Sequence, residues 1–187
     1  MVLLINSAEN QIDEYIRPIA EILKQNGIVY EVRHYSDQGM DTIMRFDRVI
    51  ISGSPRGDDI VVHHSPYFSW IKSVDKAVFG ICAGHHIIGY IYGSQLIRDK
   101  EGAVGELMVR VQHQDAIFSG LSTEFPVQEN HNDAITLPDQ FLLLASSDVC
   151  TVEMMRHRQR PIYSSQFHPE YLNPQLLLNF IRMPLAT

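Results

Sequence analysis

Hydrophobic residues in the N-terminal half of the chain occur in short runs, and segments with helical spacing lie between them. The runs have the length and apolar character of buried strands: Val2–Asn6, Ile28–Arg33, Arg48–Ser52 and Ala77–Ile81. Between the first two, apolar residues recur at helical spacing over Asn10–Asn26, and Gly27 follows as a C-cap. Pro18 lies inside this segment and indicates either a kink or a later helix start.

A second helical stretch runs from about Ala83 to Tyr92, directly after the fourth strand. Strands that alternate with helices predict parallel β-α-β units.

The C-terminal half is richer in strands. Strand patterns cover Leu107–Gln112, Phe125–Gln128, Phe141–Ser146, Thr151–Met155 and Ile162–Phe167. A closing helix is predicted over Asn173–Arg182, with Asn173 as its cap and Pro174 in the first position. We therefore expect one α/β domain over residues 1–187. It should have three layers, with a central mixed, mostly parallel sheet between helices and a small antiparallel sheet.

Composition narrows the possible functions. The chain has 187 residues and a net charge of -7, which disfavours nucleic acid and anionic membranes as partners. Its longest apolar runs are of strand length, too short to span a membrane. Only two cysteines occur, which favours a reducing, cytoplasmic location over a disulfide-bonded scaffold.

The sharpest chemical motif is Gly80-Ile81-Cys82-Ala83-Gly84, between a predicted strand and a helix. Glycines two positions on either side of a nucleophile permit the tight turn of a nucleophile elbow. The N–H groups and dipole at the start of the following helix favour a thiolate and can stabilise an oxyanion. Taken alone, the motif also fits a buried structural cysteine.

A general base and a group that orients it are available near the end of the chain. His168 follows the predicted strand Ile162–Phe167, and Glu170 lies two residues further on. A carboxylate at that spacing can accept from one imidazole nitrogen and leave the other to face Cys82. This predicts a Cys-His-Glu triad.

Other candidate groups carry weaker signals. Cys150 lies in a probable strand without a glycine elbow and is expected to be structural. His63 and His64, or Cys82 with His85 and His86, suggest metal binding, but the spacings do not match a zinc site, so no metal is expected. His113 and His157 have the pattern of surface residues.

Three motifs together resemble class I glutamine amidotransferases. The elbow is similar to that family's Gly-Ile-Cys-x-Gly-His-Gln signature, and Gln166–Glu170 matches its second signature in full. Ile50–Pro55 resembles the strand and Gly-Gly-Pro turn that supply an oxyanion-hole N–H. The segments 115–121, 129–133 and 152–157 are most similar to the glutaminase part of GMP synthetase, in the form where that part is a free subunit.

The resemblance implies a role for each matching residue. Cys82, His168 and Glu170 would form the triad, and the backbone of Ser54 and Ala83 would form the oxyanion hole. Gly53 and His86 would lie at the substrate glutamine. His131 and Asp133 would couple this site to a separate ATP-dependent synthetase that converts XMP to GMP. No phosphate-binding Gly-x-x-x-x-Gly-Lys loop occurs, so the ATP-using half is expected on another chain, and no cofactor is expected here.

Three positions depart from the family pattern. Ala83 follows the nucleophile, Ser54 replaces the second glycine of the turn, and His86 replaces the usual Gln. His86 motivates a first alternative, a hydrolase of another amide such as a γ-glutamyl bond. Ser54 and His86 together motivate a second, a non-catalytic regulatory subunit with the same fold.

Overall fold

The computed structural model describes residues 1–9, 13–37, 39–55 and 60–184. Its main feature is one nine-stranded sheet with the strand order β2-β1-β3-β4-β11-β10-β9-β6-β7. The parallel half contains β1 (Val2–Asn6), β2 (Tyr30–His34), β3 (Arg48–Ile51), β4 (Ala77–Ile81) and β11 (Ile162–Ser165). The antiparallel half contains β10 (Met154–His157), β9 (Phe141–Ser146), β6 (Ala103–Val111) and β7 (Glu124–His131).

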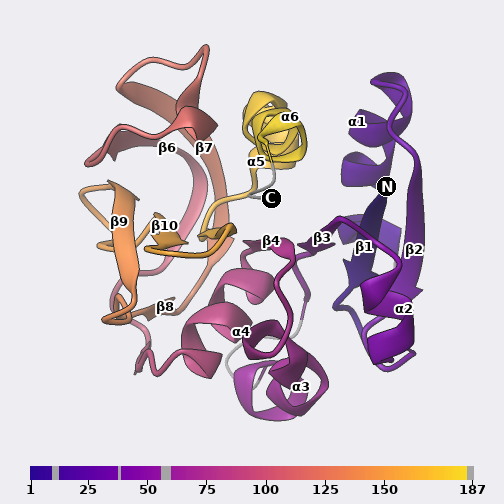
Figure 1. Ribbon diagram of the computed structural model, residues 1–187. Helices are drawn as coiled ribbons and strands as arrows, with labels where there is room; N and C mark the ends of the chain where they lie inside the picture. Colours follow the sequence, from indigo (N-terminus) through magenta and orange to yellow (C-terminus); the bar gives the residue numbers. More distant parts are fainter. Residues whose placement is uncertain (10–12, 38, 56–59, 185–187) are drawn as a thin grey trace.

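Helices cover both faces of the parallel half (Figure 1). On one face lie α1 (Arg17–Gln25), α5 (Pro169–Leu172) and α6 (Pro174–Arg182). On the other lie α2 (Met40–Met44), α3 (Ile60–Phe68) and α4 (Ala83–Ile91). This arrangement confirms the predicted three-layer α/β fold.

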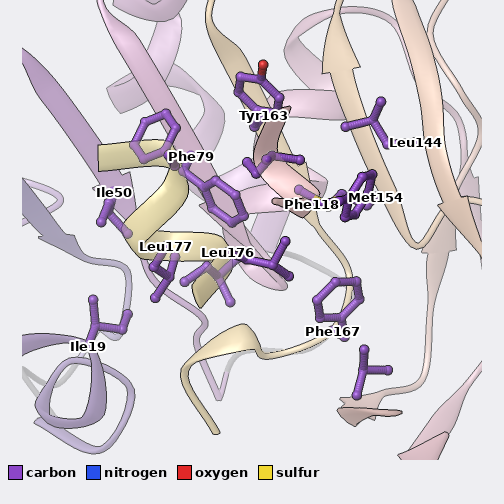
Figure 2. Close-up of a cluster of buried hydrophobic side chains, with 14 of the residues drawn as sticks. Ile19, Ile50, Phe79, Phe118, Leu144, Met154, Tyr163, Phe167, Leu176 and Leu177 are labelled. Atoms are coloured by element: carbon purple, nitrogen blue, oxygen red, sulfur yellow. The ribbon is translucent and has the colours of Figure 1, made fainter. Parts of the chain in front are cut away.

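The two cores follow directly from the alternation of side chains along the strands. In β1, Leu4 packs into the core beneath α1 and α6, whereas Leu3 and Ile5 pack into the core beneath α3 and α4. Figure 2 shows the first core, in which Leu176 and Leu177 of α6 pack between strand residues and Ile19 of α1. Strands that are buried on both faces account for the continuous apolar runs in the sequence.

Shorter elements complete the described chain. Three 3-10 helices are present: η1 (Asp13–Tyr15), η2 (Ser69–Lys72) and η3 (Ala116–Phe118). The strands β5 (Leu96–Ile97) and β8 (Ala134–Ile135) form the small antiparallel sheet that the sequence predicts. Among the described helices, none has the length and apolar character needed to cross a membrane.

Several predicted elements differ in their bounds. The first helix starts at Arg17, which places Pro18 in its first turn, where proline is tolerated. Its predicted start at Asn10 lies outside the described residues. The strand predicted over Thr151–Met155 is shifted to Met154–His157, and α3 was not predicted because its apolar residues lack helical spacing.

Two predicted side-chain environments were wrong. Asn173 occupies the N-cap position of α6, but its side chain donates to the carbonyl of Pro126 instead of capping the helix. His157 is 6% exposed, packed edge-on against Tyr92 and Phe141, and is not a surface residue.

The sheet determines where the motifs meet. Strands β3, β4 and β11 are adjacent and parallel, so their carboxyl ends share one edge. Ser52–Pro55, Cys82 and Gln166–Glu170 directly follow these three strands. Open α/β sheets bind ligands at this edge.

Candidate active site

Cys82 occupies a strained turn between β4 and α4. Its φ is 49°, a value that L-residues rarely adopt. Both glycines are required by packing: a Cβ on Gly80 would lie 2.5 Å from the carbonyl oxygen of Gly84, and one on Gly84 would lie 2.7 Å from that of Ile51. A strained, buried backbone at this place is typical of a functional site.

Backbone contacts fix this turn to the neighbouring strand. The N–H of Cys82 donates to the carbonyl of Ser165 at 2.8 Å, which joins the elbow to the end of β11. Cys82 is also the N-cap of α4, so the N–H of Ala83 belongs to the first turn, whose N–H groups have no acceptor within the helix.

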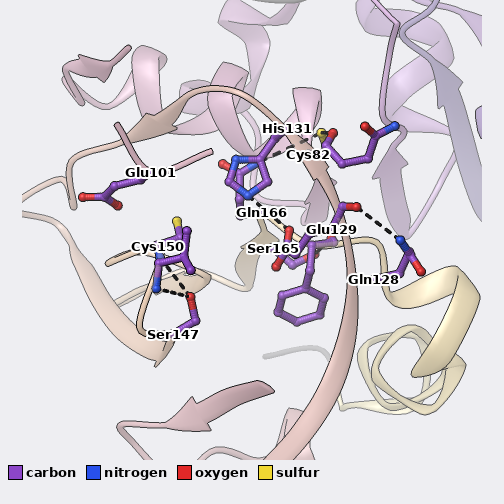
Figure 3. A network of polar contacts seen from close by, with 12 residues as sticks. Cys82, Glu101, Gln128, Glu129, His131, Ser147, Cys150, Ser165 and Gln166 are labelled. Atoms are coloured by element: carbon purple, nitrogen blue, oxygen red, sulfur yellow. Dashed lines mark hydrogen bonds and ion pairs between the residues drawn. The ribbon is translucent and has the colours of Figure 1, made fainter. Parts of the chain in front are cut away.

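Two polar groups approach the sulfur of Cys82 from neighbouring strands. The carbonyl oxygen of Asn130 and the side-chain Nε2 of Gln166 each lie 4.0 Å from Sγ. Figure 3 shows Cys82 beside Gln166 and His131. The sulfur therefore faces one hydrogen-bond acceptor and one donor.

His168 and Glu170 form a buried hydrogen-bonded pair. Nδ1 of His168 lies 2.8 Å from Oε1 of Glu170, and the two residues are 2% and 6% exposed. The N–H of His168 donates to the carbonyl of Gln128 in β7, and Pro169 starts α5 directly after it. The imidazole is thus held by its backbone and by its ring.

The electrostatics of His168 link it to Cys82. Burial lowers the pKa of His168, but the charge of Cys82 and side-chain hydrogen bonds with Cys82 and Glu170 outweigh burial and raise it to about 11. An imidazolium beside a sulfur of opposite charge is the arrangement that activates a cysteine nucleophile.

The turn after β3 reaches the same place. A Cβ on Gly53 would lie 3.0 Å from Cε1 of His168 and 2.9 Å from Cδ1 of Tyr15. The next residue, Ser54, lines the same cavity as Cys82 and Ala83. The predicted oxyanion-hole residues and the predicted triad are therefore brought together.

A cavity of about 160 Å³ opens beside the nucleophile. Its walls come from the turn after β3, the start of α4 and the end of β7: Tyr15, Ser54, Pro55, Ile60, Cys82, Ala83, His86, Asn130, His131, Asn132 and Asp133. Nε2 of His86 lies 2.7 Å from Oε1 of Gln166, so this ring contacts both the cavity and a buried amide.

His131 and Asp133 lie in the cavity wall and are connected to each other. Nδ1 of His131 lies 2.9 Å from the carbonyl oxygen of Asp133. Because a carbonyl only accepts, Nδ1 carries a proton. The carboxylate of Asp133 is 3% exposed and accepts from the N–H of Asp99 at 3.1 Å.

Two fully buried carboxyl groups lie behind His131. Oε2 of Glu129 is 3.2 Å from Nε2 of His131, and Glu129 forms a side-chain hydrogen bond with Glu153. Burial is the main cause that raises the pKa of Glu129 to about 7 and that of Glu153 to about 8, and the nearby Glu129 charge raises that of Glu153 further. At neutral pH this pair therefore retains protons, which avoids two uncompensated buried charges.

Sequence reasoning missed several residues of this site. Gln166 was noted only as part of a motif, although its position two residues before His168 puts it on the same strand exit. Tyr15 lies 6.2 Å from the ring of His168, centroid to centroid, and carried no local sequence signal. Glu129 and Glu153 are far apart in sequence, and only the sheet brings them together.

The weaker candidates lie elsewhere. Cys150 is fully buried, and burial raises the pKa of its thiol, which makes it unreactive. His63 and His64 contact each other through their Nδ1 atoms at 3.1 Å, away from Cys82. Within the described ranges, no group of three His, Cys, Asp or Glu residues is arranged to hold a metal ion.

Comparison with known proteins gives a consistent result. The model of the family "Glutamine amidotransferase class-I" matches residues 9–180. The glutamine-hydrolyzing subunit of GMP synthase from Methanosarcina mazei is 37% identical over 142 residues, which cover 73% of each chain. The corresponding subunit from Thermoplasma acidophilum is 38% identical over 138 residues, covering 71% of this chain and 69% of the relative.

Solved structures agree with the fold. A protein of Thermoplasma acidophilum described as a GMP synthase subunit superposes with a TM-score of 0.86 at 30% identity, covering 97% of this chain and 92% of that one. A glutamine amidotransferase from Thermotoga maritima, at 15% identity and a TM-score of 0.72, shares the fold over 91% of this chain and 76% of its own. The chain therefore belongs to the class I glutamine amidotransferase family.

Proposed function

We propose that this protein is the glutamine-hydrolysing subunit of a two-subunit GMP synthase, with Cys82, His168 and Glu170 as its catalytic triad. One observation carries the proposal: a strained cysteine and a buried His–Glu pair follow adjacent, in-register strands, with the pKa of His168 raised by Cys82. The GMP synthase relatives from two archaea support the choice of this enzyme within the family.

In this mechanism Sγ of Cys82 attacks the side-chain carbonyl carbon of glutamine. The N–H groups of Ser54 and Ala83 stabilise the negative oxygen of the tetrahedral intermediate. When the intermediate collapses, the C–N bond breaks, and His168 gives its proton to the departing nitrogen to form ammonia. Water then attacks the thioester while His168 takes a proton from it, which releases glutamate and regenerates Cys82. Glu170 orients His168 throughout.

The second half of the reaction belongs to another chain. The relatives are named glutamine-hydrolyzing subunits of GMP synthase, which supports delivery of the ammonia to a separate synthetase subunit. His131 and Asp133 are suited to signal between the two sites because they line the cavity next to Cys82.

The proposal is tested by measuring ammonia release from glutamine, with and without an ATP-dependent GMP-forming subunit supplied with XMP and ATP. We expect release that rises when the partner and its substrates are present. Cys82→Ser should lower it by at least about 100-fold. Full activity in the Cys82→Ser variant would overturn the triad.

His86 in the cavity wall supports one alternative, hydrolysis of another γ-glutamyl amide. The same assay with γ-glutamyl amides in place of glutamine separates the two. Turnover of the amides, with no release from glutamine in the presence of the partner, would replace the first proposal with the second.

A further inference from the structure

Three side chains form a continuous row of polar contacts that ends at the sulfur of Cys82. Nε2 of His86 lies 2.7 Å from Oε1 of Gln166, and Nε2 of Gln166 lies 4.0 Å from Sγ of Cys82. Gln166 is fully buried and His86 is 7% exposed. The backbone N–H of Gln166 donates to the carbonyl of Glu153 at 2.8 Å, which fixes the side chain at its base as well as its tip.

The direction of the Gln166 amide decides its effect on the sulfur. The amide nitrogen only donates hydrogen bonds and the amide oxygen only accepts them. With Oε1 on the N–H of His86, the NH₂ group faces Sγ, where a donor favours the thiolate over the thiol. The opposite orientation would place a carbonyl oxygen against the sulfur and favour the protonated thiol.

We propose that Gln166 is a further catalytic residue whose side-chain N–H stabilises the Cys82 thiolate, and that His86 is a positioning residue that selects this orientation of the amide. The proposal rests on the proposed role of Cys82 as the nucleophile. It gives His86 a different task from holding the substrate, the role that the family resemblance assigns to the residue at this position.

Cavity geometry predicts that the two residues affect different kinetic parameters. The described residues that line the cavity include His86 but not Gln166. Substitution of Gln166 should therefore lower kcat for glutamine and leave KM within about twofold, whereas substitution of His86 should change both.

The direct test is the pH dependence of Cys82 alkylation by iodoacetamide, followed by mass spectrometry of the intact protein. Cys150 is fully buried, so the reaction reports Cys82. In Gln166→Met, the pH of half-maximal alkylation should move upward by about one unit, because the thiolate loses a hydrogen-bond donor. Gln112→Met, which removes an amide that donates to Ser146 on the surface, serves as the matched control and should react like the wild type.

A second variant guards against misfolding. Gln166→Glu keeps the size of the side chain and the oxygen facing His86, but replaces the NH₂ group with oxygen. Alkylation at pH 8 should fall by at least about tenfold, because an ionised carboxylate opposes a neighbouring thiolate. Thermal unfolding of both Gln166 variants confirms that the tested proteins are folded.

His86 is tested by loss and rescue. His86→Phe should move the alkylation midpoint in the same direction as Gln166→Met, because the amide loses the donor that orients it. His86→Gln restores a donor and should return the midpoint towards the wild-type value.

Two outcomes overturn the proposal. An unchanged midpoint in a folded Gln166→Met variant would mean that the amide only packs against the sulfur, and a downward shift would mean that its oxygen faces Sγ. Failure of the proposed function looks different, since it would appear as glutaminase activity that survives complete alkylation of Cys82.

Discussion

The backbone of Gly53 lies against the imidazole of His168, so that a methyl group on Gly53 would be 3.0 Å from Cε1 of that ring. The same methyl group would lie 2.9 Å from Cδ1 of Tyr15. Because His168 is buried and bonded to Glu170, a displaced ring loses its alignment with Cys82. We expect Gly53→Ala to lower kcat for glutamine hydrolysis by about tenfold or more.

The matched control for this change is Gly39→Ala. Gly39 lies at the start of α2 and a Cβ there would have no atom within 4 Å. Ammonia release should be normal in this variant. Normal release in Gly53→Ala as well would show that Tyr15 alone gives way and that the ring of His168 keeps its position.

The backbone strain at Cys82 predicts a conflict between activity and stability. With φ at 49°, the position favours glycine, and strain of this kind costs about 1–3 kcal/mol. Glycine relieves the strain but has more entropy to lose on folding, which offsets about 0.5–1 kcal/mol. Cys82→Gly should therefore unfold at higher urea concentration than Cys82→Ala, by about 1 kcal/mol, while both variants are inactive. A Cys82→Ala variant of equal or greater stability would contradict a strained elbow.

Loss of the Glu170 carboxylate should affect both catalysis and the pH dependence of stability. Glu170 is one of the groups that raise the pKa of His168 to about 11, above its ordinary 6.5. A raised imidazole pKa stabilises the fold fully below pH 6.5, and this contribution is lost as the pH rises towards 11. In Glu170→Gln we expect the loss to occur at lower pH and kcat to fall by about 100-fold.

Urea unfolding between pH 6 and 10 measures the first effect, and ammonia release at pH 8 the second. If the two unfolding curves stayed parallel over this range, Glu170 would not be coupled to the charge on His168.

The buried carboxyl pair predicts an opposite trend in the neutral range. Glu153 has a pKa of about 8 in the folded protein against an ordinary value of 4.5, so the folded state holds an extra proton between these values. Stability therefore decreases as the pH rises from about 4.5 to 8. Glu153→Gln removes this proton and should flatten the dependence by up to about 1.4 kcal/mol per pH unit.

The measurement is urea unfolding from pH 5.5 to 8.5. Glu106→Gln, on the exposed side of β6, is the control and should follow the wild type. A Glu153→Gln curve with the wild-type slope would mean that the carboxyl pair is ionised in the folded protein.

The sequence was most informative where a local rule determines the structure. Gly80 and Gly84 predict the elbow because backbone atoms leave no room for a side chain at either position. The spacing of His168 and Glu170 predicts their contact because two residues across a strand exit bring side chains to one side. Gly27, with φ of 66°, ends the first helix as predicted.

The parts that the sequence did not reveal depend on contacts between distant segments. Gln166 meets His86 across 80 residues of chain, and Glu129 meets Glu153 only because β7 and the segment before β10 converge behind the site. Burial of His157 likewise depends on Tyr92 and Phe141, which no local pattern connects with it. No periodicity encodes contacts of this kind.

The central position of β11 has a consequence for the synthesis of the protein. This strand, the last along the described chain, pairs with β4 on one side and β10 on the other. A ribosome adds about 5–20 residues per second, so the segment carrying His168 emerges several seconds after Cys82. Until then β4 lacks a neighbour and the thiol lacks its base. The nascent chain is therefore chemically silent, and activity begins only when the final strand closes the sheet.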